Sequence, residues 1–77
     1  HGVRVNAMCP GFTRTPMVEE GVLDGDPTKE AGLVARVPMG RLGTVEEIAA
    51  GIVFMLSEEA AFMTGQAMVM DGGITAA

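Results

Sequence analysis

Hydrophobic and polar positions alternate near the start of the chain. Val3, Val5 and Ala7 occupy every second position, and the Pro10-Gly11 pair follows shortly after. This period of two predicts a β-strand over residues 3–8. Asn6 suits a strand interior poorly, so we expect its amide to be hydrogen-bonded to neighbouring groups. A second apolar run predicts another strand over residues 66–70.

The hydrophobic period changes to that of a helix between Thr44 and about Ser57. Thr44 and Glu47 have the spacing of a capping box, in which each side chain satisfies an orphan backbone N–H at the helix start. The apolar stripe that we expect to pack on the sheet consists of Val45, Ile48, Ala49, Ile52 and Leu56. Residues 57–63 predict one further helical turn, which the Thr64-Gly65 pair ends.

The opposite side of this helix carries Ala50, Gly51 and Phe54 where a solvated face would carry charge. Gly51 costs the helix about 1 kcal/mol relative to Ala, which suggests that another backbone approaches closely there. We expect a second buried face, against another helix of the same subunit or of a partner subunit. The alternative is that Phe54 is simply exposed beside two small residues.

A long connection rich in turn signals runs from Pro16 to Pro38. We expect two short helices in it, the second capped by Asp26 and beginning at Pro27. Connections of this length in a compact domain are usually functional lids or disordered inserts. The apolar residues within this one favour a lid that closes over an apolar ligand.

The order of strand, helix-containing connection and strand predicts an α/β fold made of a single βαβ unit. Its two strands should pair in parallel through a right-handed crossover. Such a unit leaves a sheet edge unpaired and a sheet face uncovered. The 77-residue chain also opens at His1, without an initiator methionine. We therefore expect a piece cut from a longer protein.

Composition and charge narrow the function classes. The chain is 48% hydrophobic and 19% charged, as expected of a packed globular protein, and it has no stretch long enough to span a bilayer. Its net charge of −5 and scattered basic residues argue against a nucleic-acid partner. Cys9 is the single cysteine, which excludes an internal disulfide, and with one histidine it provides no metal cage. We expect a reduced, cytoplasmic protein.

The candidate chemistry lies in residues 10–15, the strand-end turn, which directly follows the first predicted strand. In parallel sheets, ligands bind at the carboxyl ends of the strands. The backbone groups and two threonine hydroxyls of this turn can pair with a planar amide, such as a nicotinamide carboxamide. A Pro-Gly pair followed by threonines is common, however, and threonines also cap helices in ordinary turns.

Three further segments make the pattern specific: residues 2–6, residues 38–49, and the ending that contains Thr64-Gly65 and Asp71-Gly72-Gly73. With the strand-end turn, they resemble the short-chain dehydrogenase/reductase family in order and spacing, over nearly all of the chain. The resemblance implies a Rossmann-type doubly wound parallel sheet. Residues 1–77 would be the C-terminal βαβ portion of its single NAD(P)-binding domain, with the N-terminal part absent.

The resemblance also implies a cofactor, NAD or NADP, and a substrate lid. The residues implied to line the nicotinamide are Pro10, Gly11 and Phe12 as the wall behind the ring, Thr13 through its backbone, and Thr15 through its side chain. Many family members have Ile or Val at the position of Thr13, which matters little for a backbone contact. Residues 16–38 would be the variable substrate lid, with Met17 near its hinge and in contact with substrate. Arg41 and Asp71 are expected to hold structure.

The family's phosphate-binding glycine turn, ribose-selecting residue and Ser-Tyr-Lys catalytic set would lie upstream of His1. The segment Gly40-Arg41-Leu42-Gly43 does not replace the glycine turn, because it lacks a third glycine and a preceding strand. The chain has no tyrosine, so we expect it to supply no catalytic residue and to be inactive by itself.

The implied complete protein transfers hydride between the nicotinamide and a small-molecule ketone or secondary alcohol. It would be a homotetramer, or an assembly of this chain with the missing N-terminal half, and it would have no membrane partner. The alternative is a non-catalytic fragment or truncated paralogue that acts through its interaction surface, for example by filling a sheet edge.

Overall fold

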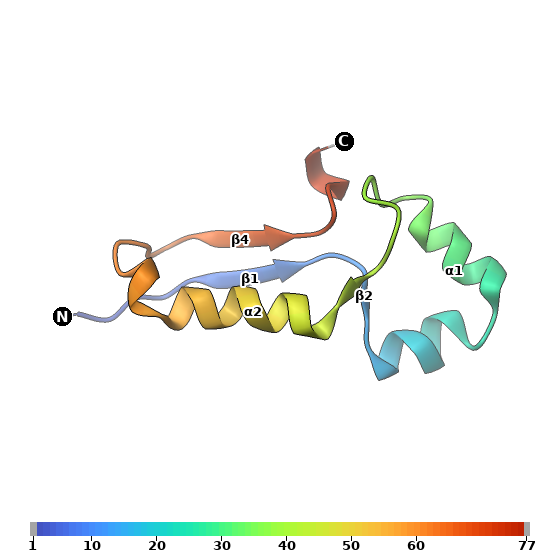
Figure 1. The fold of residues 1–77 in the computed structure, drawn as a ribbon, viewed down its shortest axis with the longest axis horizontal. Coiled ribbons are helices and arrows are strands. Elements are labelled where there is room, and N and C mark those ends of the chain that lie inside the picture. The colour runs from blue at the N-terminus through green and yellow to red at the C-terminus, as the bar shows by residue number, and fades with distance from the viewer. Residues whose placement is uncertain (1, 77) are drawn as a thin grey trace.

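Two parallel strands and one long helix form the centre of the molecule in the computed structural model, which describes residues 2–76 (Figure 1). Strand β1 (Ala7–Pro10) pairs with β4 (Ala67–Met70), with Ala7 opposite Ala67 and Pro10 opposite Met70. Helix α2 (Val45–Leu56) runs alongside them on one face. The parallel pairing and the βαβ order confirm the predicted fold class.

Residues 3–6 are not part of a strand, so that portion of the predicted first strand is wrong. Their neighbour is the irregular segment after α2: the Val5 carbonyl accepts from Gly65 N at 2.7 Å, and Val5 N donates to Thr64 Oγ1 at 3.2 Å. Asn6 is hydrogen-bonded as predicted, with its Nδ2 donating to the Met63 carbonyl and its Oδ1 accepting from Gln66 N. Because residues 3–6 bond to an irregular segment, they cannot extend the regular hydrogen-bond ladder between β1 and β4.

Helix α2 begins and ends where the sequence predicts. Thr44 Oγ1 accepts from Glu47 N at 3.1 Å, and the Glu47 carboxylate accepts from Thr44 N at 2.9 Å, which confirms the capping box. The helix ends at Leu56, and the Ser57 hydroxyl donates to the Phe54 carbonyl. The predicted extra turn follows as a single 3₁₀ turn, η2 (Glu58–Ala60).

The face of α2 that packs on the sheet differs from the predicted stripe. Its buried residues are Gly51 and Met55, whereas Leu56 of the predicted stripe is 79% exposed. A Cβ added at Gly51 would lie 2.4 Å from Met70 Sδ and 2.8 Å from Met8 Cε. The close approach at Gly51 is therefore real, but it is made by methionine side chains of the chain's own sheet and not by another backbone.

The predicted second buried face is not formed within the described chain. Ala50 is exposed and Phe54 remains 38% exposed. Gly51, which was expected on that face, belongs instead to the face that packs on β1 and β4.

The connection between β1 and α2 contains the two predicted helices. They are η1 (Val18–Leu23), a π-helical segment, and α1 (Pro27–Val34). Asp26 Oδ1 accepts from Thr28 N at 2.8 Å, which confirms Asp26 as the cap of α1. Both helices lie beyond the strand ends, away from the β1, β4 and α2 layers (Figure 1).

A second pair of parallel strands, each of two residues, joins the two ends of this connection. Strand β2 (Thr13–Arg14) pairs with β3 (Gly43–Thr44), with Thr13 opposite Gly43. After β4, residues 71–73 form a turn that leads into a final 3₁₀ turn, η3 (Ile74–Ala76). Across residues 2–76, the helices are all too short or too polar to span a bilayer.

Candidate functional site

The strand-end turn leaves the sheet at the carboxyl ends of β1 and β4. Gly11 N donates to the Met70 carbonyl at 3.1 Å. A Cβ added at Gly11 would lie 2.8 Å from the Cα of Asp71, closer than real Cβ atoms approach. Glycine is therefore required where the two strand ends come together, and Pro10 is the last residue of β1 before this contact.

Phe12 contacts two segments that are distant in the chain, one at Gly43 and one at Arg36. Its carbonyl accepts from Gly43 N at 2.9 Å, and the Arg36 guanidinium lies 5.1 Å from the centre of its ring. This distance is typical of a cation–π contact. Sequence reasoning did not anticipate Arg36, because nothing in the local pattern brings residue 36 to residue 12.

The backbone of Thr13 faces away from its partner strand. Gly43 N bonds to the carbonyl of Phe12, and successive residues of a strand direct their backbone groups to opposite sides, so the N–H and C=O of Thr13 point away from β3. Outside the β2–β3 ladder, neither group forms a hydrogen bond within residues 2–76. The Thr13 hydroxyl turns back and donates to the Gly11 carbonyl at 3.1 Å.

Thr15 fixes the entry to the connection and keeps one hydrogen-bonding function free. Its Oγ1 accepts from Val18 N at 3.2 Å, at the start of η1. The hydroxyl hydrogen takes no part in that bond, so it can donate to a carbonyl oxygen. Met17, two residues on, is 81% exposed and is not enclosed by the described residues.

The predicted cofactor-binding residues all lie in the strand-end turn, but they do not line the same pocket. A cavity of about 290 Å³ has Phe12 in its wall, together with Val37, Met39, Ile48, Val69 and Met70. A more open cavity of about 470 Å³ has Thr15 in its wall, together with Arg14, Pro16, Glu19, Glu20 and residues 44–46. Within residues 2–76, the turn thus presents two separate surfaces.

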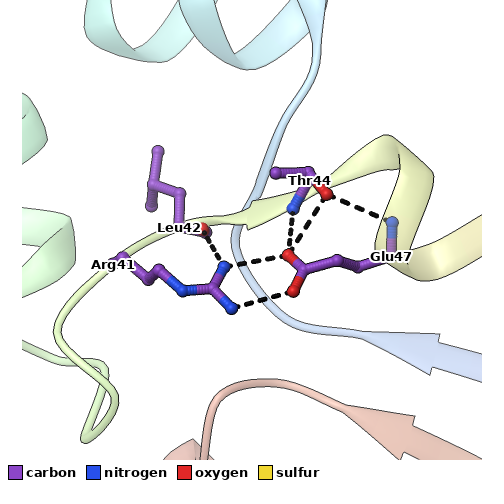
Figure 2. Close-up of polar contacts among 4 residues, drawn as sticks. All are labelled: Arg41, Leu42, Thr44 and Glu47. Carbon is purple, nitrogen blue, oxygen red and sulfur yellow. Dashed lines mark hydrogen bonds and ion pairs between the residues drawn. The ribbon is translucent and has the colours of Figure 1, made fainter.

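Arg41 and Glu47 form a bidentate ion pair at the start of α2, with two N–O distances of 2.8 Å (Figure 2). The Arg41 guanidinium, together with the bonds from Thr44, holds the pKa of Glu47 at about 2, below its ordinary value of 4.5. Sequence reasoning identified Glu47 as a cap but missed this pair. Its contacts fit the structural role that was predicted for Arg41.

Asp71 also has a structural role, as predicted. Its carboxylate accepts from Gly73 N at 2.9 Å and from Thr75 N at 3.0 Å, and these bonds lower its pKa. The turn that it holds contacts the end of the long connection, because Met39 N donates to the Gly72 carbonyl at 3.0 Å. Within residues 2–76, no group of three or more His, Cys, Asp or Glu side chains is arranged to bind a metal ion.

The parallel βαβ unit, with a glycine turn at the carboxyl ends of its strands, places the protein among α/β proteins, the class that includes the Rossmann-type folds. A family model described as enoyl-(acyl carrier protein) reductase matches residues 1–75. The chain belongs to the short-chain dehydrogenase/reductase family, which confirms the resemblance.

Individual relatives support the same family and show how much of them the chain covers. The chain is 47% identical to 2-(S)-hydroxypropyl-CoM dehydrogenase 3 of Xanthobacter autotrophicus, with 97% of the chain and 30% of the relative aligned. It is 46% identical to the inactive 2-(S)-hydroxypropyl-CoM dehydrogenase 2 of the same strain, with 97% of the chain and 34% of the relative aligned. The chain thus spans about a third of the length of these relatives.

A solved structure confirms the fold. It is a candidate 2-deoxy-d-gluconate 3-dehydrogenase from Agrobacterium tumefaciens with bound NADP. It superposes with a TM-score of 0.88 at 36% identity, over 99% of the chain and 30% of that protein. The NADP bound in this structure is one of the two nicotinamide cofactors that the family resemblance implies.

Proposed function

We propose that residues 1–77 are the C-terminal part of a single NAD(P)-binding domain in an oxidoreductase. The complete, cytoplasmic enzyme transfers hydride between NAD or NADP and a small-molecule ketone or secondary alcohol. The observation that carries this proposal is the strand-end turn, which offers the Thr13 backbone and the Thr15 hydroxyl at the carboxyl edge of the sheet. Family membership and the NADP bound by a relative support it.

The groups of the turn fit a nicotinamide carboxamide. A carboxamide has an N–H donor and a carbonyl acceptor, and the outward-facing backbone of Thr13 together with the Thr15 hydroxyl has the complementary functions. Pro10, Gly11 and Phe12 would form the wall behind the ring. When bound, the nicotinamide supplies or accepts the hydride.

The chain positions the cofactor but does not transfer the proton. A ketone that accepts hydride also needs a proton donor for its oxygen. The chain has no tyrosine, and no other residue is proposed as catalytic. The proton would come from another part of the complete protein.

Residues 16–38, the lid, are proposed to contact the substrate. Met17 is 81% exposed immediately after the Thr15 contact, and Val22 of η1 is also exposed. Exposed apolar side chains on a segment beside a ligand site are suited to cover an apolar part of a substrate. Met17 is the residue of the lid that we propose to touch substrate.

Cofactor affinity tests the role of Thr15. In the complete protein, Thr15→Ala should weaken NADH or NADPH binding by roughly 5-fold, because one hydrogen bond contributes about 1 kcal/mol. Thr13→Val should bind nearly as well as wild type, since its contact is made by the backbone. Thr28→Ala, a matched change in the exposed part of the lid, is the control. Unchanged affinity in Thr15→Ala would contradict the proposed contact.

A second candidate is a non-catalytic family member that acts through its interaction surface. It is consistent with the 46% identity to a relative that is named inactive, which nearly equals the 47% identity to the relative named without that word. Similarity in this region therefore does not separate active from inactive members. Binding of dinucleotide without oxidation or reduction of any ketone or alcohol tested, by the complete protein, would favour this candidate.

The apolar side chains that α2 leaves exposed support an assembly. Phe54, Ile52 and Leu56 are apolar and exposed along this helix. We propose that they are covered in a homotetramer or by the remainder of the same domain. Phe54→Asp should split a tetramer because it buries an unpaired charge. Sedimentation of the complete protein measures this, and an unchanged oligomer would contradict the tetramer contact.

A further inference from the structure

The two helices of the lid are held to the rest of the chain by very little apolar packing. Helix α1 has no buried residue, and Leu23 is the single buried residue of η1. The lid's other buried residue, Val37, follows the two helices. Figure 1 shows both helices beyond β2, at a distance from the layers of β1, β4 and α2. A segment with so little buried surface needs other contacts to keep one position.

One side chain joins both lid helices to the strand-end turn. Arg14 Nη1 lies 2.9 Å from Glu19 Oε1 in η1, and Arg14 Nη2 contacts Glu30 Oε1 in α1. The planar guanidinium has donors on separate nitrogens, so it can bind two carboxylates from different elements at once. Lysine, with one compact charge, does not have this geometry.

Arg14 is also the residue between the two threonines of the proposed cofactor contact. Its backbone is paired in β2 with Thr44, the cap of α2, so the main chain at this point is fixed to the scaffold. The side chain extends to the lid, and Thr15 next to it also contacts the lid, because its Oγ1 accepts from Val18 N at 3.2 Å. Movement of the lid would therefore reach Thr15, one of the two residues that would hold the carboxamide, through this contact with η1.

We infer that Arg14 is a positioning residue that couples closure of the lid to binding of the dinucleotide. With Glu19 and Glu30 both paired, the lid is held against the strand-end turn, and Thr13 and Thr15 keep their positions. Exposed ion pairs are weak and are screened by salt, which suits a lid that must open in each catalytic cycle. Coupling is reciprocal, so bound dinucleotide should in turn hold the lid closed. This inference rests on the proposed function.

Proteolysis within the lid can test the coupling without an activity assay. Lys29 is the single lysine of residues 1–77 and is exposed in α1. The complete, folded protein is treated with endoproteinase Lys-C, and the cut after Lys29 is followed by mass spectrometry with and without NADH or NADPH. When opening is fast, the cutting rate reports the population of the open lid.

We expect Arg14→Gln to be cut roughly 3-fold faster than wild type without dinucleotide, as the loss of two weak pairs implies. Dinucleotide should slow the cut in wild type and should slow it less in Arg14→Gln. Glu19→Gln removes one of the two ion pairs, so its cutting rate should lie between those of wild type and Arg14→Gln. Glu30 is left unchanged because it adjoins the cleaved bond. Arg14→Lys should recover part of the protection, because it restores the charge without the planar fork.

Glu20→Gln is the matched control. It removes one carboxylate from η1 that has no ion-pair partner within residues 2–76, so its cutting rate should equal that of wild type. The inference is overturned if Arg14→Gln is cut at the wild-type rate, or if dinucleotide protects both proteins equally. A wild-type protein that binds no dinucleotide would defeat the proposed function as well, and a direct binding measurement distinguishes the two failures.

Discussion

The two α-helices of this chain are held in different ways. Helix α2 is packed against methionine side chains of the sheet through Gly51, and its start is fixed by the bonds among Thr44, Glu47 and Arg41. Helix α1 has no buried residue, and an ion pair between Glu30 and Arg14 ties it to β2. Helix α2 is therefore part of a scaffold, whereas helix α1 can move at a small cost in free energy. The proposed cofactor residues lie at the junction of these two regions.

The largest difference between the regions should appear at their glycines. In the complete protein, Gly11→Ala should reduce the free energy of unfolding by about 1–3 kcal/mol, because the new Cβ would overlap the backbone of Asp71. Denaturant unfolding measures this change. Gly21→Ala in η1 is the control, since its Cβ would meet nothing within 4 Å. If both substitutions changed the free energy of unfolding equally, the ends of β1 and β4 could separate to admit the new Cβ without a cost in stability.

The two helix caps give a second comparison. Thr44→Ala should destabilise the complete protein by about 1 kcal/mol, because it removes the capping bond to Glu47 N at the start of a packed helix. Asp26→Ala removes the equivalent bond from α1. Its effect on global unfolding should be smaller, and it should instead increase hydrogen exchange of the amides in residues 28–34. A global loss from Asp26→Ala as large as that from Thr44→Ala would contradict the division into scaffold and lid.

Glycines inside the two helices sharpen the comparison further. Gly32→Ala in α1 should protect the amides of that helix by up to about 1 kcal/mol, because alanine has the higher helix propensity and the site is open. Gly51→Ala should gain less, since the same propensity is offset by overlap with Met70 and Met8. Hydrogen exchange of each helix provides the measurement. An equal gain at both sites would show that the methionines move aside freely.

The smallest effect concerns pH. The folded-state pKa of Glu47 is about 2, below its ordinary value of 4.5, so its pairing stabilises the fold fully above about pH 4.5 and is lost as the pH falls toward 2. Arg41→Gln should raise the pKa of Glu47 toward its ordinary value, as measured by NMR titration of the carboxyl group. A Glu47 pKa that stays near 2 in this variant would show that the Thr44 bonds alone hold it.

Features that depend on neighbouring residues in the chain were predictable. The capping box at Thr44, the Asp26 cap with Pro27 after it, and the order of strand and helix are all set by local patterns. The family was recognisable for the same reason, because its motifs are short segments at characteristic spacings. The strand-end turn at the end of β1 belongs to this group of features.

The parallel pairing of the two strands was predictable, but the side chains that meet across distant parts of the chain were not. The helical period of α2 showed an apolar stripe, but the face that packs on the sheet is set by Gly51, where a missing side chain admits Met8 and Met70. The contact of Arg36 with Phe12 and the β2–β3 pair likewise join segments that are far apart in the chain. No local pattern encodes which distant partner a side chain meets.

The α/β class, the helix starts, the family and the turn proposed to hold the cofactor could all be predicted from the sequence, because each rests on patterns within short segments. The folded structure was needed to show which face of α2 is buried, how the lid is attached, and that Arg14 of the turn pairs with both lid helices. These depend on side chains brought together by folding, and the geometry of packing and charge pairing exists only once the chain has its three-dimensional form.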